Sequence, residues 1–136
     1  MMRSEEPGKP VILVTDDEPF ILQYIRHVLQ LANYSVITAT SVDEAWAILM
    51  GQPEIDLVLT DIVMPGSMDG LEFATKIHQL DRDLPVLFIT GALSQTDART
   101  TNITEGQVLL RKPFYPKQLV EFVGAQMRRE TPGLAR

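Results

Sequence analysis

Five short runs rich in Val, Ile and Leu recur along this chain, and they constrain its fold more than any other feature. They lie at residues 11–14, 35–39, 56–60, 85–90 and 107–112. Most are apolar at consecutive positions, which is typical of strands covered on both faces in a parallel sheet. The chain therefore predicts a parallel sheet of five strands.

Amphipathic segments separate these runs and predict helices. Residues 19–31 carry one apolar stripe at helical spacing, and Ser41 with Glu44 forms a capping box at the start of a second helix. Further helices are expected over residues 70–80 and after Pro116. The segment between the fourth and fifth runs is rich in threonine, a poor helix former, so we expect only a short or frayed helix there.

The alternation predicts an α/β fold: a single doubly wound, five-stranded parallel sheet with about five helices. Right-handed crossovers place helices on both faces of such a sheet, and ligands bind at the carboxyl ends of its strands. We expect one domain over residues 9–127, with short polar tails at residues 1–8 and 128–136. The length of 136 residues suits one such core.

The composition excludes several classes of protein. The 18 acidic and 12 basic side chains give a net charge of −6, which argues against binding nucleic acid through a basic face. Without cysteine the chain forms no disulfide, and its longest apolar run, AWAILM, is too short to span a membrane. We therefore expect a cytoplasmic domain that binds neither nucleic acid nor membrane.

Five polar residues stand at the ends of predicted strands. They are Asp16 and Asp17 after the first strand, Asp61 after the third, Thr90 at the end of the fourth and Lys112 at the end of the fifth. If the strand order is 2-1-3-4-5, these strands are neighbours and the five side chains share one edge of the sheet. Clustered carboxylates suit Mg²⁺, and a lysine opposite them would supply the second positive charge that a phosphoryl group needs.

Each of these residues also has a simpler interpretation when it is taken alone. Asp17 could cap the helix that begins near Pro19, and Asp61 could cap a loop. Thr90 could be an ordinary strand residue, and Lys112 could be a solvated charge. Their joint placement favours one site over five coincidences.

The motifs that carry these residues resemble the receiver domain of response regulators, the phosphoacceptor part of two-component signalling. The matching stretches are LVTDDEP, LVLTDIVMPGSMDGLE, VLFIT and LLRKPF, and the resemblance covers about residues 9–127. It implies a flavodoxin-like sheet of order 2-1-3-4-5. It also implies a signalling phosphoacceptor rather than an enzyme with a separate substrate: a domain that catalyses its own phosphorylation and dephosphorylation.

The resemblance assigns the acceptor and the metal ligands. Asp61 would take a phosphoryl group from a histidine kinase or a phosphotransfer protein, and the domain would then change the surface that binds an unknown downstream protein. Asp17, Asp61 and the backbone carbonyl of Val63 would bind Mg²⁺. Asp16 would reach the metal through water.

The resemblance also assigns the groups around the phosphoryl group. Lys112 and Thr90 would bind it, and Thr90 would report its arrival. The Lys112–Pro113 bond matches a cis peptide of the family, and Gly70 matches a loop glycine behind the acceptor. Three residues before the lysine, where the family commonly has a Tyr or Phe switch, this chain has Leu109. The aromatic switch is therefore absent.

Other positions carry further expectations. The loop MPGSMDG is one residue longer than the family's usual M-P-x-M-D-G, as in receivers attached to hybrid kinases. Val63 and Ala92 stand where side chains would flank the hydrolytic water, and neither can hydrogen-bond to it, so dephosphorylation should be slow. Phe20 and Phe114 are predicted to form an apolar rim where the kinase docks.

Alternative functions fit less well. A flavodoxin needs a phosphate loop of small residues after the first strand, where this chain has TDDEPF, and the phosphate-loop motif of nucleotide hydrolases is missing. A phosphatase with an aspartyl intermediate would want an acid in place of Val63. The remaining alternative is a pseudo-receiver that binds proteins without phosphorylation; Leu109 is consistent with it, but the intact acids, Thr90 and Lys112 argue against it.

Overall fold

The computed structural model of the chain places five strands in one sheet of order β2-β1-β3-β4-β5. It describes residues 8–51, 54–81, 83–91 and 108–129. The strands are β1 (Val11–Thr15), β2 (Ser35–Ala39), β3 (Leu57–Asp61), β4 (Val86–Thr90) and β5 (Leu109–Arg111). All four pairings are parallel, and Val14 of β1 lies between Thr38 of β2 and Leu59 of β3. The predicted fold class and strand order are confirmed.

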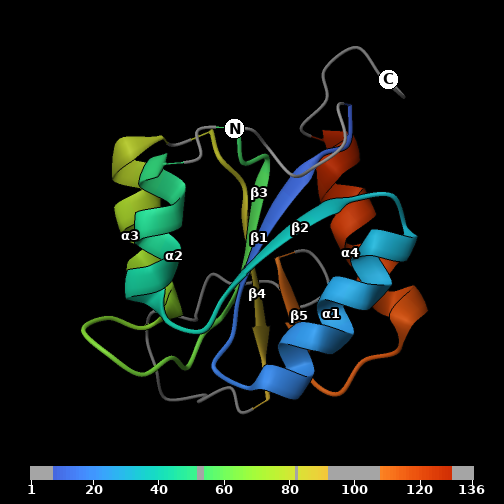
Figure 1. Cartoon of the computed structure of the whole chain (residues 1–136), viewed down its shortest axis with the longest axis horizontal. Helices are drawn as coiled ribbons and strands as arrows, with labels where there is room; N and C mark the ends of the chain where they lie inside the picture. Colours follow the sequence, from blue (N-terminus) through green and yellow to red (C-terminus); the bar gives the residue numbers. More distant parts are fainter. Residues whose placement is uncertain (1–7, 52–53, 82, 92–107, 130–136) are drawn as a thin grey trace.

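Four helices in the described residues cover the two faces of the sheet. They are α1 (Pro19–Leu31), α2 (Val42–Gly51), α3 (Gly70–Leu80) and α4 (Pro116–Arg129). Helices α2 and α3 lie on one face, and α1 and α4 lie on the other (Figure 1). The helix expected between β4 and β5 would fall within residues 92–107, outside the described residues. None of the helices in this described part has the length and apolar character needed to cross a bilayer.

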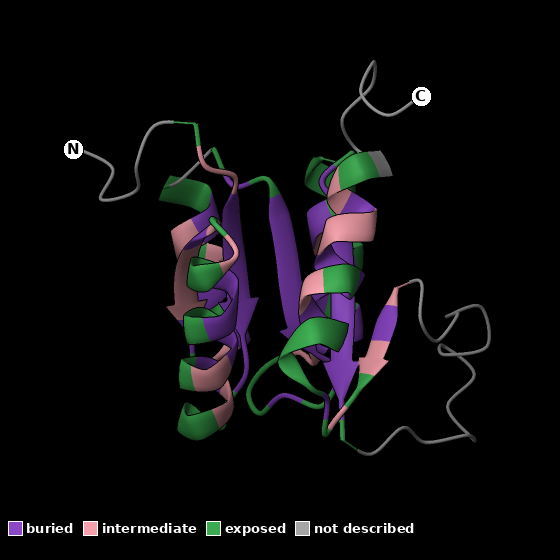
Figure 2. Cartoon of the chain, turned by 90° about the vertical axis from the view of Figure 1, so that its right-hand side faces the viewer, coloured by how far each residue is buried: buried purple, intermediate pink, exposed green. Residues whose placement is uncertain are grey.

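The strands are apolar on both sides because both sides are covered (Figure 2). Ile12, Leu57 and Leu87 are fully buried on the side of α1 and α4, while Leu13 and Val58 are fully buried on the side of α2 and α3. Burying each such side chain stabilises the fold by about 1.5–3 kcal/mol. The sheet is therefore a rigid frame, and residues at its carboxyl edge are held in fixed relative positions.

Capping interactions fix where two helices begin at this edge. Asp69 accepts a hydrogen bond from the Glu72 backbone N–H, and the Glu72 carboxylate accepts one from the Asp69 N–H, both at 2.9 Å. At α2, the Glu44 N–H donates to Ser41 Oγ at 3.1 Å, as predicted. The Glu44 carboxylate, however, accepts from the Thr40 N–H rather than from the serine.

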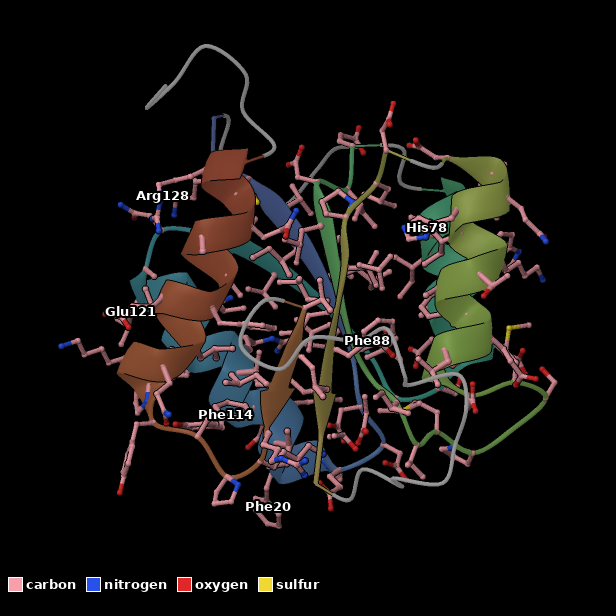
Figure 3. The ribbon with its side chains drawn as sticks, turned by 180° about the vertical axis from the view of Figure 1, so that it is seen from behind. Phe20, His78, Phe88, Phe114, Glu121 and Arg128 are labelled. Carbon is pink, nitrogen blue, oxygen red and sulfur yellow. The ribbon has the colours of Figure 1, made fainter. Side chains whose placement is uncertain are left out.

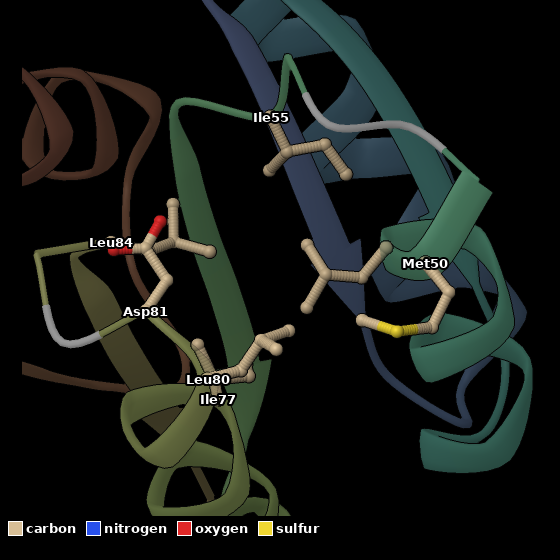
Figure 4. A pocket seen from close by; sticks show the side chains of 7 residues that line it. Met50, Ile55, Ile77, Leu80, Asp81 and Leu84 are labelled. Carbon is tan, nitrogen blue, oxygen red and sulfur yellow. The ribbon is translucent and has the colours of Figure 1, made fainter.

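A hollow of about 310 Å³ lies at the opposite, amino-terminal edge of the sheet (Figure 4). Its walls are mostly apolar and come from the ends of α2 and α3 and from the residues before β3 and β4, among them Met50, Ile55, Leu80, Asp81 and Leu84. Because the strands are parallel, the length of the sheet separates this hollow from the carboxyl edge. It is not part of the predicted site.

Candidate functional site

Three carboxylates meet at the carboxyl edge of the sheet. Asp16 and Asp17 follow β1 and Asp61 ends β3, and these two strands are paired. One oxygen from each of the three side chains lies within 4.8 Å of the others. Asp16 and Asp61 are buried, whereas Asp17 is exposed. The structure therefore brings the three predicted acids together, with an inner side closed by the protein and an outer side open to solvent.

Lys112 brings a positive charge to the same place. Its Nζ lies 2.8 Å from Asp16 Oδ2 and 2.9 Å from Asp61 Oδ2. The peptide bond between Lys112 and Pro113 is cis, as the resemblance implies. Glu18 is a third partner, with its Oε1 3.1 Å from Nζ. The sequence analysis did not predict the contact between Glu18 and Lys112. The signal available for it was the run of three consecutive acids after β1.

The charged groups of the cluster, and their burial, shift the pKa values of Asp16 and Lys112. Burial raises the pKa of Asp16, and the Lys112 ammonium and the Glu18 backbone N–H offset this only in part. Burial alone would lower the pKa of Lys112, but its close contacts with Asp16, Asp61 and Glu18 outweigh burial and raise that pKa above its ordinary value. Lys112 is therefore a permanent positive charge at neutral pH.

The cluster carries more negative charge than one ammonium can neutralise. Among the described residues, four carboxylates, those of Asp16, Asp17, Glu18 and Asp61, gather at this edge with one ammonium, that of Lys112. Asp16 Oδ2 is buried and lies close to the ammonium, yet it receives no well-aligned hydrogen bond from the described residues. Hard, clustered oxygens of this kind suit Mg²⁺, which binds carboxylates while keeping several waters. The residues present therefore fit a divalent cation at Asp16, Asp17 and Asp61.

The loop after β3 holds Asp61 from behind. Its Oδ1 accepts a hydrogen bond from the Val63 backbone N–H at 3.1 Å. The Gly70 N–H donates to the Ile62 carbonyl at 2.8 Å, so the first residue of α3 lies directly against the backbone of Asp61 and Ile62. A Cβ at Gly70 would collide with the Asp61 carbonyl oxygen. Only glycine fits this position without movement of the backbone.

This combination of fold and site has a match among known families. A family model described as the response regulator receiver domain matches residues 12–124, which is most of the chain. The chain belongs to this family. The family predicted from the motifs at the carboxyl edge of the sheet is therefore confirmed.

Individual receiver proteins are similar to this chain in sequence or in structure. The phosphate regulon transcriptional regulatory protein PhoB of Pseudomonas aeruginosa is 32% identical over 129 residues, which cover 93% of this chain and 55% of PhoB. The heme response regulator HssR of Staphylococcus aureus is 33% identical over 117 residues, or 86% of this chain and 51% of HssR. A CheY-like receiver domain protein from Methanospirillum hungatei is 26% identical with a TM-score of 0.80, over 90% of this chain and 97% of that one. The chain thus spans about half the length of PhoB and of HssR.

The structure also places the remaining residues predicted for the receiver site. Thr90 is buried at the end of β4, and its carbonyl accepts a hydrogen bond from the Lys112 N–H at 2.8 Å. Leu109 is fully buried on β5 in register with Phe88. Ala92 lies outside the described residues. The position where receivers commonly have an aromatic switch is therefore occupied by an aliphatic side chain of the core.

The two phenylalanines predicted to dock a kinase differ. Phe20 is 85% exposed in the first turn of α1, and its ring projects outward at the carboxyl edge of the sheet (Figure 3). Phe114 is buried in the core, with its ring centroid 5.7 Å from that of Tyr24, whose hydroxyl donates to the Phe114 carbonyl at 2.7 Å. Contrary to the prediction, the Phe114 ring is not available to a partner. The neighbouring Tyr115 is exposed instead.

Proposed function

We propose that this receiver domain accepts a phosphoryl group on Asp61 from the phosphohistidine of a histidine kinase or a phosphotransfer protein. The observation that carries the proposal is the position of Lys112 Nζ, 2.9 Å from Asp61 Oδ2, in a cluster that also contains Asp16 and Asp17. A carboxylate nucleophile, a permanent cation and acids that bind a metal are the groups that such a transfer uses.

The proposed step exchanges one bond to phosphorus for another. An oxygen of the Asp61 carboxylate attacks phosphorus, an O–P bond forms, and the P–N bond to the donor imidazole breaks. The electron pair of that bond stays on the imidazole nitrogen, and the ring becomes neutral histidine by taking up one proton. Lys112 and the Thr90 hydroxyl are proposed to bind the transferred oxygens. Mg²⁺, bound by Asp16, Asp17, Asp61 and the Val63 carbonyl, would neutralise charge on those oxygens.

Incubation with acetyl phosphate and MgCl₂ tests the proposal. Intact mass spectrometry should show one added phosphoryl group on the wild type, and none on Asp61→Asn or on wild type treated with EDTA. Asparagine has nearly the same shape as aspartate but is not a nucleophile here, and circular dichroism checks that the variant folds. A folded wild type that stays unmodified in Mg²⁺ would instead support the pseudo-receiver that binds proteins without phosphorylation.

The phosphoaspartate is expected to be long-lived. The Val63 side chain is exposed beside the acceptor and offers no hydrogen bond to a hydrolytic water. Val63→Asn should shorten the lifetime several-fold because its amide can orient that water, while Val63→Ala should not, since it removes bulk without adding a polar group. After acetyl phosphate is removed by desalting, the decay is followed by intact mass. Complete decay of the wild type within seconds would refute the expectation.

Phe20 is proposed to contact the phosphodonor protein, because it is an exposed aromatic side chain three residues after Asp17. Buried aromatic anchors at interfaces are typically worth about 2 kcal/mol or more, so Phe20→Asp should slow transfer from a phosphorylated phosphotransfer protein by at least tenfold. Transfer from acetyl phosphate should be unchanged. Leu31→Asp is the matched control, since Leu31 is 75% exposed at the other end of α1. Equal rates for Phe20→Asp and wild type with the protein donor would exclude this contact.

A further inference from the structure

Glu18 holds the solvent side of the Lys112 ammonium. Its Oε1 accepts a hydrogen bond from Nζ at 3.1 Å, across 94 positions of sequence. The Glu18 side chain is 60% exposed, compared with 0% for Asp16 and 8% for Asp61. Of the three carboxylates that contact Lys112 in the described chain, Glu18 is therefore the one that water can reach. It is not one of the acids that fit the metal.

Three carboxylate oxygens already surround the ammonium: Glu18 Oε1 and Asp61 Oδ2 accept hydrogen bonds from it, and Asp16 Oδ2 lies in ion-pair contact. The ammonium carries three N–H groups, and the three carboxylate oxygens lie within 3.1 Å of Nζ. A phosphoryl oxygen that approaches Nζ therefore competes with these oxygens for the ammonium. Asp16 is buried, and its other oxygen is held by the Glu18 backbone N–H at 2.9 Å. Asp61 would carry the phosphoryl group itself. Glu18 can return to water at little cost, because exposed ion pairs contribute little.

We propose that phosphorylation of Asp61 displaces Glu18 from Lys112, and that the freed carboxylate beside Phe20 displays the phosphorylated state on the surface of α1. This inference rests on the proposed function. The phosphoryl group brings nearly two negative charges to the ammonium. Repulsion between this group and the Glu18 carboxylate therefore acts in the same direction as their competition for the Lys112 ammonium. In the unmodified protein Glu18 is a positioning residue, since it holds the ammonium that the phosphoryl group later takes.

The surroundings of Glu18 allow this exchange without disturbing α1. Its backbone N–H donates to Asp16 Oδ1, and its carbonyl accepts from the Leu22 N–H at 3.1 Å. Its side chain makes no capping hydrogen bond to the described helix. The side chain can therefore turn to solvent while the backbone stays in place. The output is an unpaired carboxylate two residues before the exposed Phe20. This output does not need an aromatic residue at position 109.

Beryllofluoride, a stable analogue of the phosphoryl group, tests the competition on the whole chain in MgCl₂. Glu18→Gln should bind it several-fold more tightly than the wild type, because a neutral amide competes less well for the ammonium. Asp43→Asn is the matched control, since it removes an exposed charge from the start of α2, at the same edge of the sheet. Its affinity should equal that of the wild type. Equal or weaker binding by Glu18→Gln would overturn the proposal, and so would equal tightening by both variants.

A second measurement follows the carboxylate itself. The side-chain ¹³C carboxyl resonance of Glu18, identified by its loss in Glu18→Gln, should move to the position of a hydrated glutamate when beryllofluoride saturates the wild type. An unmoved resonance would overturn the displacement while leaving the proposed function intact. A wild type that neither binds beryllofluoride nor reacts with acetyl phosphate would overturn both.

Discussion

A Gly70→Ala variant is expected to lose about 3 kcal/mol of its free energy of unfolding, the upper part of the range for overpacked sites, and to accept phosphoryl groups much more slowly. The added Cβ would collide with the Asp61 carbonyl oxygen and lie 3.0 Å from Ile62 Cα. Neither group can move freely. The Thr60 hydroxyl donates to that carbonyl at 3.0 Å, and the Ile62 N–H is bonded to the Ile89 carbonyl. Any shift that admits the methyl group therefore moves Asp61, the proposed acceptor.

This expectation is opposite in sign to helix propensity, which favours alanine over glycine in a helix by about 1 kcal/mol. The capping box of Asp69 and Glu72 anchors the first turn of α3, so the helix cannot simply slide away from β3. Gly124→Ala is the matched control, because a Cβ there meets only the end of the Arg128 side chain, at 3.3 Å. Urea unfolding should show Gly70→Ala destabilised and Gly124→Ala unchanged or stabilised. Equal stability of Gly70→Ala and wild type would contradict the steric argument.

Much of this fold could be predicted because local pattern and long-range packing agree. Helix α1 begins at a proline, which suits the first helical position, and α3 begins directly after its N-cap residue, Asp69. Both helices have the predicted bounds, residues 19–31 and 70–80. The acids of the site could be predicted for the same reason, since each stands at or just after the end of a strand and parallel strands bring their carboxyl ends together.

Contacts between side chains far apart in the sequence could not be predicted. Phe114 is buried because its ring packs in the core on the side of α1 and α4, against Tyr24, which is 90 positions away. Nothing in the stretch KPFYP distinguishes it from the exposed Tyr115. The contact between Glu18 and Lys112 has the same origin. It depends on how two flexible side chains meet across strands β1, β3, β4 and β5, not on the position of either residue relative to its own strand.

Lys112→Met is expected to destabilise the metal-free protein by about 3–5 kcal/mol, the usual consequence of removing one partner from a buried ion pair. Methionine keeps the apolar stem but leaves the carboxylates of Asp16 and Asp61 without their cation. MgCl₂ should restore part of the loss, because a ligand at about 100 times its Kd adds about 2.7 kcal/mol to the folded state. Urea unfolding with and without MgCl₂ measures both effects.

The pH dependence of the free energy of unfolding is the sharpest test of the prediction for Lys112→Met. Burial raises the pKa of Asp16, so the folded protein binds that proton more tightly than the unfolded chain does. Such a carboxyl costs stability above its pKa, and the cost falls as pH decreases through that pKa. Without Lys112 the pKa should rise further, so the deficit should be smaller at pH 5 than at pH 7. Lys76→Met is the control: its Nζ lies 4.3 Å from the centroid of the Trp46 ring, and its loss should cost about 0.5–1 kcal/mol without any dependence on pH or Mg²⁺. A Lys112→Met deficit no larger than that of Lys76→Met would show that the ammonium does not neutralise the acids at the edge of the sheet.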